Sequence, residues 1–456
     1  MIDLATIVKA YDVRGVVPDQ LDERVATALG AAFVDVTGAT RLVTARDMRE
    51  SGPGLAAAFA AGATARGAQV LDAGLGSTDM LYFASGHLDL PGAMFTASHN
   101  PARYNGIKLC RVGAVPIGQE SGLVEIREQA QRYLEVGLSP APASTEEIDL
   151  LTDYARYLRG LVDLSGIRPL TVVVDAGNGM GGYTVPAVLG DAVLDALPLT
   201  IVPLYFELDG SFPNHEANPL EPANLVDLQK AVVAENADLG LAFDGDADRC
   251  FVVDGNGDAV SPSAITALVA TRELAKHPGA TIIHNLITSR AVPEIVREHG
   301  GVPFRSRVGH SFIKADMAST GAVFGGEHSA HYYFREFWRA DTGMLAAMHV
   351  LAALGEQPGP LVDLTSAYQR YVGSGEINST VEDQAARVAA VKTHFAARTA
   401  STDDLDGLTV ELSDGSWFNV RASNTEPLLR LNVEAPDEAT MGALRDEALA
   451  IIRESR

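Results

Sequence analysis

The sequence predicts an α/β protein of several domains, and three observations support this fold class. The chain has 456 residues, 47% of them hydrophobic, which is enough for roughly three or four domains with buried cores. Helix-like stretches such as residues 21–38 alternate with short β-rich runs such as residues 41–47. Segments rich in proline and small polar residues interrupt this alternation, as at residues 136–147. We therefore expect layered α/β domains that are joined by short linkers.

The same signals place the domain boundaries. After the linker, a helix-like segment at residues 149–162 leads into an apolar strand at residues 170–175. Residues 356–361, with two prolines and a glycine, close a third stretch, and strand-like runs at 417–423 and 428–435 form a hairpin near the C-terminus. We predict four domains, at residues 1–144, 145–251, 252–367 and 368–456.

Charge and composition argue against several classes of partner. The chain has 35 Lys and Arg against 59 Asp and Glu, so its formal net charge is −24, which disfavours binding to nucleic acids or anionic membranes. No apolar run reaches the roughly 20 residues of a membrane helix, and the first residues lack the pattern of a secretory signal. The two cysteines, Cys110 and Cys250, form no CxxC pair. We expect core thiols and a cytoplasmic protein.

The first candidate site residue is Ser98, in the segment TASHNP at residues 96–101. This segment follows the apolar run GAMF, and its proline favours a turn that presents the serine hydroxyl to a cleft. A hydrolase nucleophile is one alternative, but no GxSxG elbow surrounds Ser98. An ordinary loop serine is the other alternative, and the segment on its own does not exclude it.

Asp244, Asp246 and Asp248 form a candidate metal site in the segment FDGDADR. Carboxylates at every second position of a curved loop can point at one hard cation such as Mg²⁺. The loop is not an EF-hand, because its sixth and twelfth positions hold Arg249 and Gly255 instead of Gly and Glu. A solvated acidic turn is the other interpretation of the triplet.

Two further segments have the composition of phosphate-binding loops. The segment RASNTEPLLR combines guanidinium groups with short hydroxyl and amide side chains, although an ordinary hairpin gives the same pattern. Residues 177–182, GNGMGG, formally match a dinucleotide-binding GxGxxG, but no acid-terminated strand follows, so we do not expect a nucleotide there. The segment RASNTEPLLR, at residues 421–430, supplies the candidate phosphate ligands Arg421, Ser423, Asn424, Thr425 and Arg430.

The order of these segments resembles the α-D-phosphohexomutases, enzymes that move a phosphoryl group between C1 and C6 of a hexose phosphate. The resemblance covers the whole chain, and its YDVRG form is most similar to the bacterial phosphomannomutase/phosphoglucomutase branch. Besides the segments above, it includes AYDVRG at 10–15, ARDMRESG at 45–52, YNGIK at 104–108, VGHSFIK at 308–314 and GGEHSAH at 325–331.

The resemblance implies three similar layered α/β domains and a smaller, distinct α+β C-terminal domain around a central cleft. It implies a phosphomannomutase that interconverts mannose 6-phosphate and mannose 1-phosphate, with glucose phosphates as second substrates. Ser98 would carry the phosphoryl group, and a hexose 1,6-bisphosphate would be intermediate and activator. Mg²⁺ would bridge Ser98 to the three aspartates. We expect hexose phosphates as the partners of a monomer or homodimer.

The resemblance also implies roles for charged residues around the serine. Arg249 would stabilise the charge of the transferred phosphoryl group. Lys108 would move protons, and a neighbouring Arg14 would disfavour its charged form and make it a better base. His99 and His331 are alternative proton carriers, and the choice among the three stays open.

Sugar recognition would involve the loop GGEHSAH. The resemblance implies that Glu327 and Ser329 bind O3 and O4, which glucose and mannose share. Tyr11 and His310 would face the same cleft. The chain departs from the family pattern at Ala330, where glycine is usual.

Substrate preference and function class are the remaining open questions. HNLITSR at residues 284–290 lacks a lysine found in some bispecific relatives, which leaves the mannose-to-glucose preference open. A phosphoglucosamine mutase and a non-catalytic phosphosugar-binding protein are the alternative functions.

Overall fold

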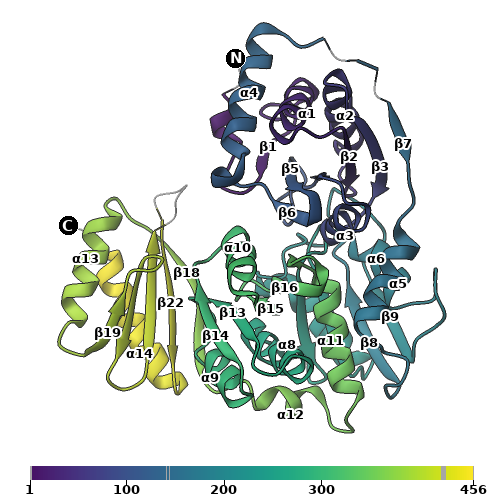
Figure 1. Ribbon diagram of the computed structural model, residues 1–456. Coiled ribbons are helices and arrows are strands. Elements are labelled where there is room, and N and C mark those ends of the chain that lie inside the picture. Colours follow the sequence, from purple (N-terminus) through teal and green to yellow (C-terminus); the bar gives the residue numbers. More distant parts are fainter. Residues whose placement is uncertain (1–2, 140, 143, 423–427, 455–456) are drawn as a thin grey trace.

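The protein is described by a computed structural model that covers residues 3–139, 141–142, 144–422 and 428–454. Four β-sheets follow one another along the chain, and helices pack against each of them (Figure 1). The first three sheets mix parallel and antiparallel strand pairs, whereas the strand pairs of the fourth are antiparallel. This confirms the predicted architecture of three layered α/β domains and a distinct α+β C-terminal domain.

The first sheet buries both of its faces, because alternate strand residues pack against helices on opposite sides. Leu42 and Ala93 join a core with α1, α2 and α4, whereas Val43 and Met94 pack toward α3. Its strand order is β1-β5-β4-β2-β3-β7, with β6 beside β5. The strands are β1 (Val13–Val16), β2 (Arg41–Arg46), β3 (Gln69–Leu75), β4 (Gly92–Phe95), β5 (Tyr104–Arg111), β6 (Val115–Pro116) and β7 (Thr145–Glu147), and the helices are α1 (Glu23–Thr37), α2 (Gly52–Ala65), α3 (Thr78–Leu88) and α4 (Leu123–Val136).

The second and third sheets each combine a parallel part with an antiparallel hairpin. In the second, with order β12-β11-β10-β8-β9, the hairpin is β10–β11; in the third, with order β14-β13-β15-β16-β17, it is β15–β16. The second has β8 (Leu170–Asp175), β9 (Leu199–Leu204), β10 (Leu239–Phe243), β11 (Cys250–Asp254), β12 (Ala259–Val260), α5 (Leu151–Leu161), α6 (Gly181–Val188) and α7 (Val226–Ala234). The third has β13 (Thr281–Asn285), β14 (Val302–Ser306), β15 (Phe324–Gly326), β16 (Tyr332–Phe334), β17 (Ala340–Asp341), α8 (Pro262–Lys276), α9 (Ala291–Glu298), α10 (His310–Thr320), α11 (Gly343–Gly355) and α12 (Leu361–Ser366).

The fourth sheet has its own hydrophobic core, separate from the core that the other three domains share. The order of its strands is β18-β22-β21-β20-β19. It consists of β18 (Val372–Thr380), β19 (Thr399–Asp403), β20 (Leu408–Leu412), β21 (Trp417–Ala422), β22 (Leu428–Ala435), α13 (Gln384–Phe395) and α14 (Glu438–Arg453). The four domains are named below by the order of these sheets. The predicted boundaries stay predictions: β7 of the first sheet begins after residue 144, and β12 of the second lies after residue 251.

The start of α3 is the junction of the first three domains. The fully buried Asp79 of the first domain accepts hydrogen bonds from Tyr154 Oη of α5 at 2.8 Å and from Thr342 Oγ1, just before α11, at 2.6 Å. Next to it, Thr78 Oγ1 donates to Asp246 Oδ2 of the candidate metal loop at 2.6 Å. The same helical turn therefore joins three domains and holds one of the predicted metal ligands.

We predict that Asp79 makes stability depend on pH. Burial raises its pKa to about 6, although the hydrogen bonds from Ser77, Thr342 and Tyr154 favour the ionised form. Because the folded-state pKa is raised, the protonated carboxyl of Asp79 favours the folded state. This contribution to the unfolding free energy is fully present below about pH 4 and is lost as the pH rises through about 6. Between pH 5 and pH 8 the wild type should lose about 1 kcal/mol of unfolding free energy relative to Asp79→Asn, measured by urea unfolding.

The matched control is Asp19→Asn, which makes the same change at an exposed position. The difference between the wild type and this variant should stay constant over the same pH range. A constant difference between the wild type and Asp79→Asn would contradict the prediction.

Candidate active site

Ser98 lies in a turn directly after β4, and a buried arginine holds the backbone of that turn. Ser98 has a positive φ of 50°, which is rare outside glycine, and its side chain is largely buried. Its N–H donates to Thr96 Oγ1 at 2.8 Å. Arg49 is only 2% exposed, and its guanidinium binds backbone carbonyl oxygens in and beside the turn. It donates to the carbonyls of Ser98 at 2.9 Å, Asn100 at 2.7 Å, Pro101 at 3.0 Å and Tyr104 at 2.9 Å.

The three aspartates lie in the loop between β10 and β11, and all are buried. One carboxylate oxygen from each aspartate lies within 4.8 Å of the chosen oxygens of the other two. Ser98 Oγ donates to Asp244 Oδ2 at 2.9 Å, which brings the predicted serine and the predicted triad together. Among the described residues, Asp246 Oδ1 and Asp248 Oδ1 have no hydrogen-bond partner. Clustered, buried carboxylate oxygens with free lone pairs suit a hard divalent cation, so these residues can hold a metal.

Two cations balance the negative charge of this loop. Lys108 Nζ lies 2.8 Å from Asp246 Oδ2 and 2.6 Å from Asp248 Oδ2, and Arg249 donates to Asp244 Oδ2 at 2.7 Å. Burial raises the pKa of Asp244 to about 7 against the opposing charge of Arg249. Burial also opposes ionisation of Asp246, but Lys108 outweighs it and lowers the pKa of that carboxyl. The positive charges of Lys108 and Arg249 therefore lie in direct contact with the buried carboxylates.

The expected lowering of the Lys108 pKa by a neighbouring Arg14 is not found in this structure. Burial lowers the pKa of Lys108, but Asp246 and Asp248 outweigh it, so the pKa lies well above its ordinary value. Arg14 instead donates to Asn100 Oδ1 at 2.6 Å and pairs with Asp12 at 2.5 Å. Strand β5 brings Lys108 to the triad loop, where it is a charged partner of Asp246 and Asp248.

His99 is held as a neutral imidazole beside Ser98. Its Nδ1 lies 3.1 Å from Ser98 Oγ and 2.5 Å from an Arg249 guanidinium nitrogen. Burial, then the charges of Arg249 and Arg14, lower its pKa well below the ordinary value. A neutral ring keeps one N–H and one acceptor nitrogen, so it can accept a hydrogen bond but is not an imidazolium acid near neutral pH.

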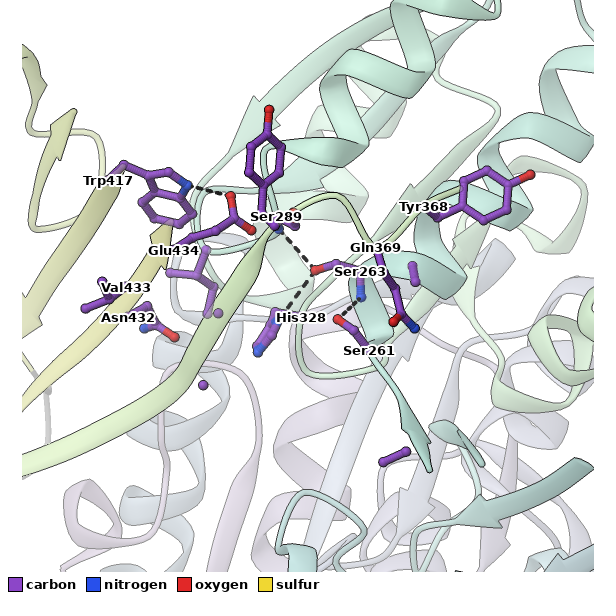
Figure 2. Close-up of a pocket in the computed structure, with 16 residues that line it drawn as sticks. Ser261, Ser263, Ser289, His328, Tyr368, Gln369, Trp417, Asn432, Val433 and Glu434 are labelled. Atoms are coloured by element: carbon purple, nitrogen blue, oxygen red, sulfur yellow. Dashed lines mark hydrogen bonds between the residues drawn. The ribbon is translucent and has the colours of Figure 1, made fainter. Parts of the chain in front are cut away.

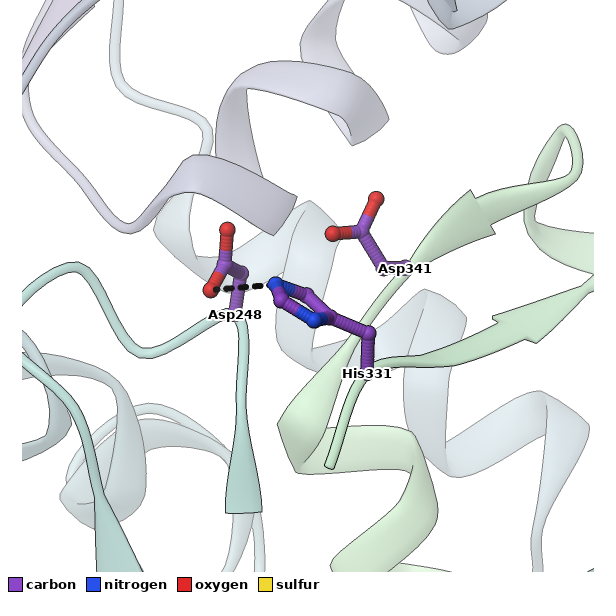
Figure 3. Close-up of side chains that lie close together, drawn as sticks. All are labelled: Asp248, His331 and Asp341. Carbon is purple, nitrogen blue, oxygen red and sulfur yellow. Dashed lines mark ion pairs between the residues drawn. The ribbon is translucent and has the colours of Figure 1, made fainter. Parts of the chain in front are cut away.

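His331 connects the metal loop to the predicted sugar loop. Its Nε2 lies 3.9 Å from Asp248 Oδ1, and its Nδ1 lies 3.0 Å from Ser329 Oγ. Figure 3 shows the ring between Asp248 and Asp341. Glu327 is fixed nearby, since its Oε2 accepts from Tyr333 at 2.6 Å. The structure therefore brings Glu327, Ser329 and His331 together beside the triad.

Tyr11 and His310 meet at the contact between the first and third domains. Their ring centroids are 4.8 Å apart. Burial lowers the pKa of His310 to about 3, so its ring is neutral. Burial, followed by the charges of Asp406 and Glu327, raises the pKa of Tyr11. Tyr11 therefore lies within the electrostatic reach of the sugar loop and of the fourth domain.

The two arginines of the predicted phosphate segment lie opposite each other on β21 and β22. Glu376 of β18 binds both, with Arg421 at 3.0 Å and Arg430 at 3.2 Å. Arg421 also lies 3.6 Å from Asp406 Oδ2. The other predicted members of this segment, Ser423, Asn424 and Thr425, lie outside the described residues.

The chain matches four family models in sequence order. Their descriptions are phosphoglucomutase/phosphomannomutase alpha/beta/alpha domain I at residues 5–136, domain II at 152–257 and domain III at 261–371, and the C-terminal domain at 376–451. The chain belongs to the phosphoglucomutase/phosphomannomutase family. The resemblance stated from its motifs is thereby confirmed.

Curated relatives and a solved structure agree with this assignment over nearly the whole chain. The chain is 40% identical to the phosphohexose mutases of Xanthomonas campestris pv. campestris, covering 97% of this chain and 98% of the relative. It is 38% identical to a phosphomannomutase of Escherichia coli, covering 98% and 99%. A phosphoglucomutase/phosphomannomutase family protein from Burkholderia thailandensis superposes with a TM-score of 0.87 at 32% identity, covering 100% and 99%. The prediction that the chain is an enzyme of the phosphohexomutase type is confirmed.

Sequence reasoning missed two supporting residues of this family member. Arg49 lies in the segment ARDMRESG, which the motif comparison included without giving its arginine a role. Thr78, which holds Asp246, has no recognisable signal, because a threonine at the start of a helix usually caps that helix.

Among the described residues, no helix is both long and apolar enough to span a membrane.

We predict that Arg49→Lys lowers kcat by about 10²-fold, because a misplaced reacting group is costly and one ammonium cannot reproduce a guanidinium fork. Mutase activity and circular dichroism should be measured together, and the spectrum should remain that of the wild type. Arg66→Lys is the matched control, since Arg66 pairs with Asp35 at an exposed position. An unchanged kcat in Arg49→Lys would show that the carbonyl contacts are dispensable.

Proposed function

We propose that the protein is a phosphomannomutase that interconverts mannose 6-phosphate and mannose 1-phosphate and also accepts the glucose phosphates. The observation that carries this proposal is the hydrogen bond from Ser98 to Asp244, within the buried triad. A phosphoryl carrier beside a cation site is what transfer between two sugar hydroxyls requires. The names of the phosphomannomutases of Escherichia coli and Salmonella support the choice of mannose.

In the proposed cycle Ser98 carries the phosphoryl group that reaches the substrate. The bond from Ser98 oxygen to phosphorus breaks as the bond from a sugar hydroxyl to phosphorus forms, giving hexose 1,6-bisphosphate and free Ser98. After the bisphosphate turns around, its other phosphoryl group returns to Ser98 and the isomerised monophosphate leaves. Arg249, which reaches Ser98 Oγ at 3.3 Å, offsets charge on the moving group.

Asp244, Asp246, Asp248 and phosphorylated Ser98 are the proposed ligands of Mg²⁺. When bound, the ion supplies charge stabilisation to the phosphoryl oxygens. A cation among the carboxylates would also compete with Lys108 for Asp246 and Asp248. Displaced from its two partners, Lys108 would lose the charges that raise its pKa, which restores it as a candidate proton carrier.

The sugar hydroxyl must lose a proton as it attacks, the departing Ser98 oxygen must gain one, and the structure favours two residues for this proton transfer. His331 lies beside one oxygen of Asp248, and Lys108 contacts the other oxygen of the same carboxylate. His99 is less suited, since its contact with Arg249 holds its pKa low. We propose His331 or Lys108 as the base and Arg14 and His99 as groups that position the serine turn.

Glu327 and Ser329 are the proposed partners of O3 and O4. Recognition through these two hydroxyls tolerates both mannose and glucose, which differ at C2. Arg421 and Arg430, with the segment between them, are the proposed site of the non-reacting phosphate, and Tyr11 and His310 complete the cleft. A cytoplasmic monomer or homodimer is the proposed form, and the two free buried cysteines fit a reducing compartment.

The first test compares turnover of mannose 1-phosphate, glucose 1-phosphate and glucosamine 1-phosphate, with Mg²⁺ and a trace of glucose 1,6-bisphosphate. We expect turnover of mannose and glucose phosphates, and a loss of about 10³-fold or more in Ser98→Ala. Ser319→Ala, at an exposed helix position, is the control. A preference for glucosamine phosphate would make the protein a phosphoglucosamine mutase, and no turnover by the primed wild type would favour a binding protein.

Removal of the metal gives a second prediction. EDTA should abolish turnover and Mg²⁺ should restore it, whereas Asp248→Asn should weaken the response to Mg²⁺ because one of three anionic ligands is lost. The measurement is kcat against free Mg²⁺ concentration, with Asp254→Asn, a buried aspartate of the same hairpin outside the triad, as the control. Full activity in EDTA would exclude the metal role.

A further inference from the structure

A cavity of about 200 Å³ lies between the third and fourth domains, apart from the triad (Figure 2). Residues of both domains line it, together with residues at the start of β18 that connect them. Figure 2 shows Trp417, Asn432 and Glu434 on one side and the serine hydroxyls with His328 facing them. Ser98, the aspartate triad, Glu327 and Arg421 are not among the lining residues. The cavity is therefore a second site candidate.

One lining group lacks the partner that a buried polar group normally has. Asn432 is 5% exposed, and its Nδ2 has no hydrogen-bond partner among the described residues. A buried amide in this state is stabilised when a ligand or water accepts its hydrogen bond. Opposite it, Ser263 Oγ lies 3.4 Å from His328 Nδ1 and accepts from the N–H of Ser289 at 3.1 Å. The cavity thus offers fixed donors and acceptors from both domains.

The charges around the cavity disfavour phosphate esters as its ligands. Among the described lining residues there is no lysine or arginine. The nearby Arg290 directs its guanidinium to the carbonyl of Gly415 at 2.6 Å. Glu434 contributes a carboxylate, whose Oε1 is already bound by Trp417 Nε1 at 2.7 Å and by the N–H of Arg290 at 3.0 Å. Burial lowers the pKa of His328, so that ring is neutral. A neutral ligand fits this lining, and an anion does not.

The volume of the cavity limits the class of ligand further. A cavity of about 150 Å³ accommodates a benzene ring, so this one has room for one six-membered ring with substituents. The aromatic residues Trp417, Tyr368 and Tyr371 are among the lining residues, together with hydroxyl, amide and imidazole groups. We propose that this cavity binds a neutral, unphosphorylated cyclic polyol, a hexopyranose or an inositol.

Binding there would join two bodies that have separate hydrophobic cores. Asn432 and Trp417 belong to the sheet of the fourth domain, whereas Ser263 and His328 belong to the third. His328 is also the residue between Glu327 and Ser329 of the sugar loop. A ligand that contacts both sides favours the arrangement of the two domains that forms the cavity. The binding itself does not depend on the proposed mutase activity.

Fluorescence can report this binding, since the chain has two tryptophans and one of them lines the cavity. In Trp338→Phe the signal comes from Trp417 alone. We would titrate this variant with myo-inositol, D-mannose and inorganic phosphate, each with and without saturating glucose 1,6-bisphosphate. We expect a saturable change in Trp417 fluorescence with at least one polyol, and the same change when glucose 1,6-bisphosphate is present. We expect no saturable change with inorganic phosphate in the presence of the bisphosphate. No saturable polyol response, a polyol response that the bisphosphate removes, or a saturable response to phosphate in the presence of the bisphosphate would overturn the proposal.

A second variant locates the site without relying on Trp338→Phe. Asn432→Leu keeps the size of the side chain but removes the amide, so the apparent Kd for the polyol should rise about tenfold or more. Asn256→Leu makes the same change on an exposed turn and should bind like the wild type. Thermal unfolding with and without the polyol measures both variants in the otherwise native chain. Equal stabilisation of Asn432→Leu and the wild type would show that the polyol acts elsewhere or as a general osmolyte.

Discussion

The whole active region depends on the burial of three carboxylates in one short loop. Such a concentration of negative charge is unfavourable in a protein interior unless cations and hydrogen-bond donors surround it. Here the second domain supplies the carboxylates and Arg249, whereas the first domain supplies Lys108 and Thr78. The stability of the metal loop and the contact between the two domains are therefore one problem, because neither charge partner can be removed without leaving the other buried and unpaired.

The start of α3 shows how the fold meets this requirement. A single helical turn places Thr78 against Asp246 and Asp79 against Tyr154 and Thr342, so three domains are fixed relative to the metal loop. On the other side, Arg49 fixes the turn that carries Ser98 through backbone carbonyls, independent of the side chains in that turn. Thr78 occupies one oxygen of Asp246, and Arg49 binds backbone carbonyls of the serine turn. This leaves Asp246 Oδ1 and Asp248 Oδ1 without hydrogen-bond partners among the described residues and available to a ligand.

Local patterns predicted the parts of the site that one segment contains. The spacing of Asp244, Asp246 and Asp248 follows from the loop alone, and the serine turn follows from Pro101 and the preceding apolar strand. The charge state of Lys108 could not be predicted, because its partners are far away in the sequence and the expected neighbour, Arg14, binds Asn100 instead. The role of Thr78 could not be predicted either, because its partner Asp246 is also far away in the sequence. The alternation of helices and strands gave the architecture, whereas contacts between domains decided the electrostatics.

The fourth domain differs from the other three because its hydrophobic core is separate. Its two candidate phosphate ligands, Arg421 and Arg430, already have a carboxylate partner. Glu376 pairs with one guanidinium nitrogen of Arg421 and one of Arg430, whereas the Nε of each arginine has no hydrogen-bond partner among the described residues. A phosphate with roughly two negative charges competes with a single carboxylate by charge and by its number of acceptor oxygens. Arg421 also lies near Asp406, which accepts a hydrogen bond from the N–H of Val308 in the third domain. Exchange of Glu376 for phosphate would therefore act on a network that reaches across the domain boundary, so that occupancy of the phosphate segment and the position of the fourth domain are linked.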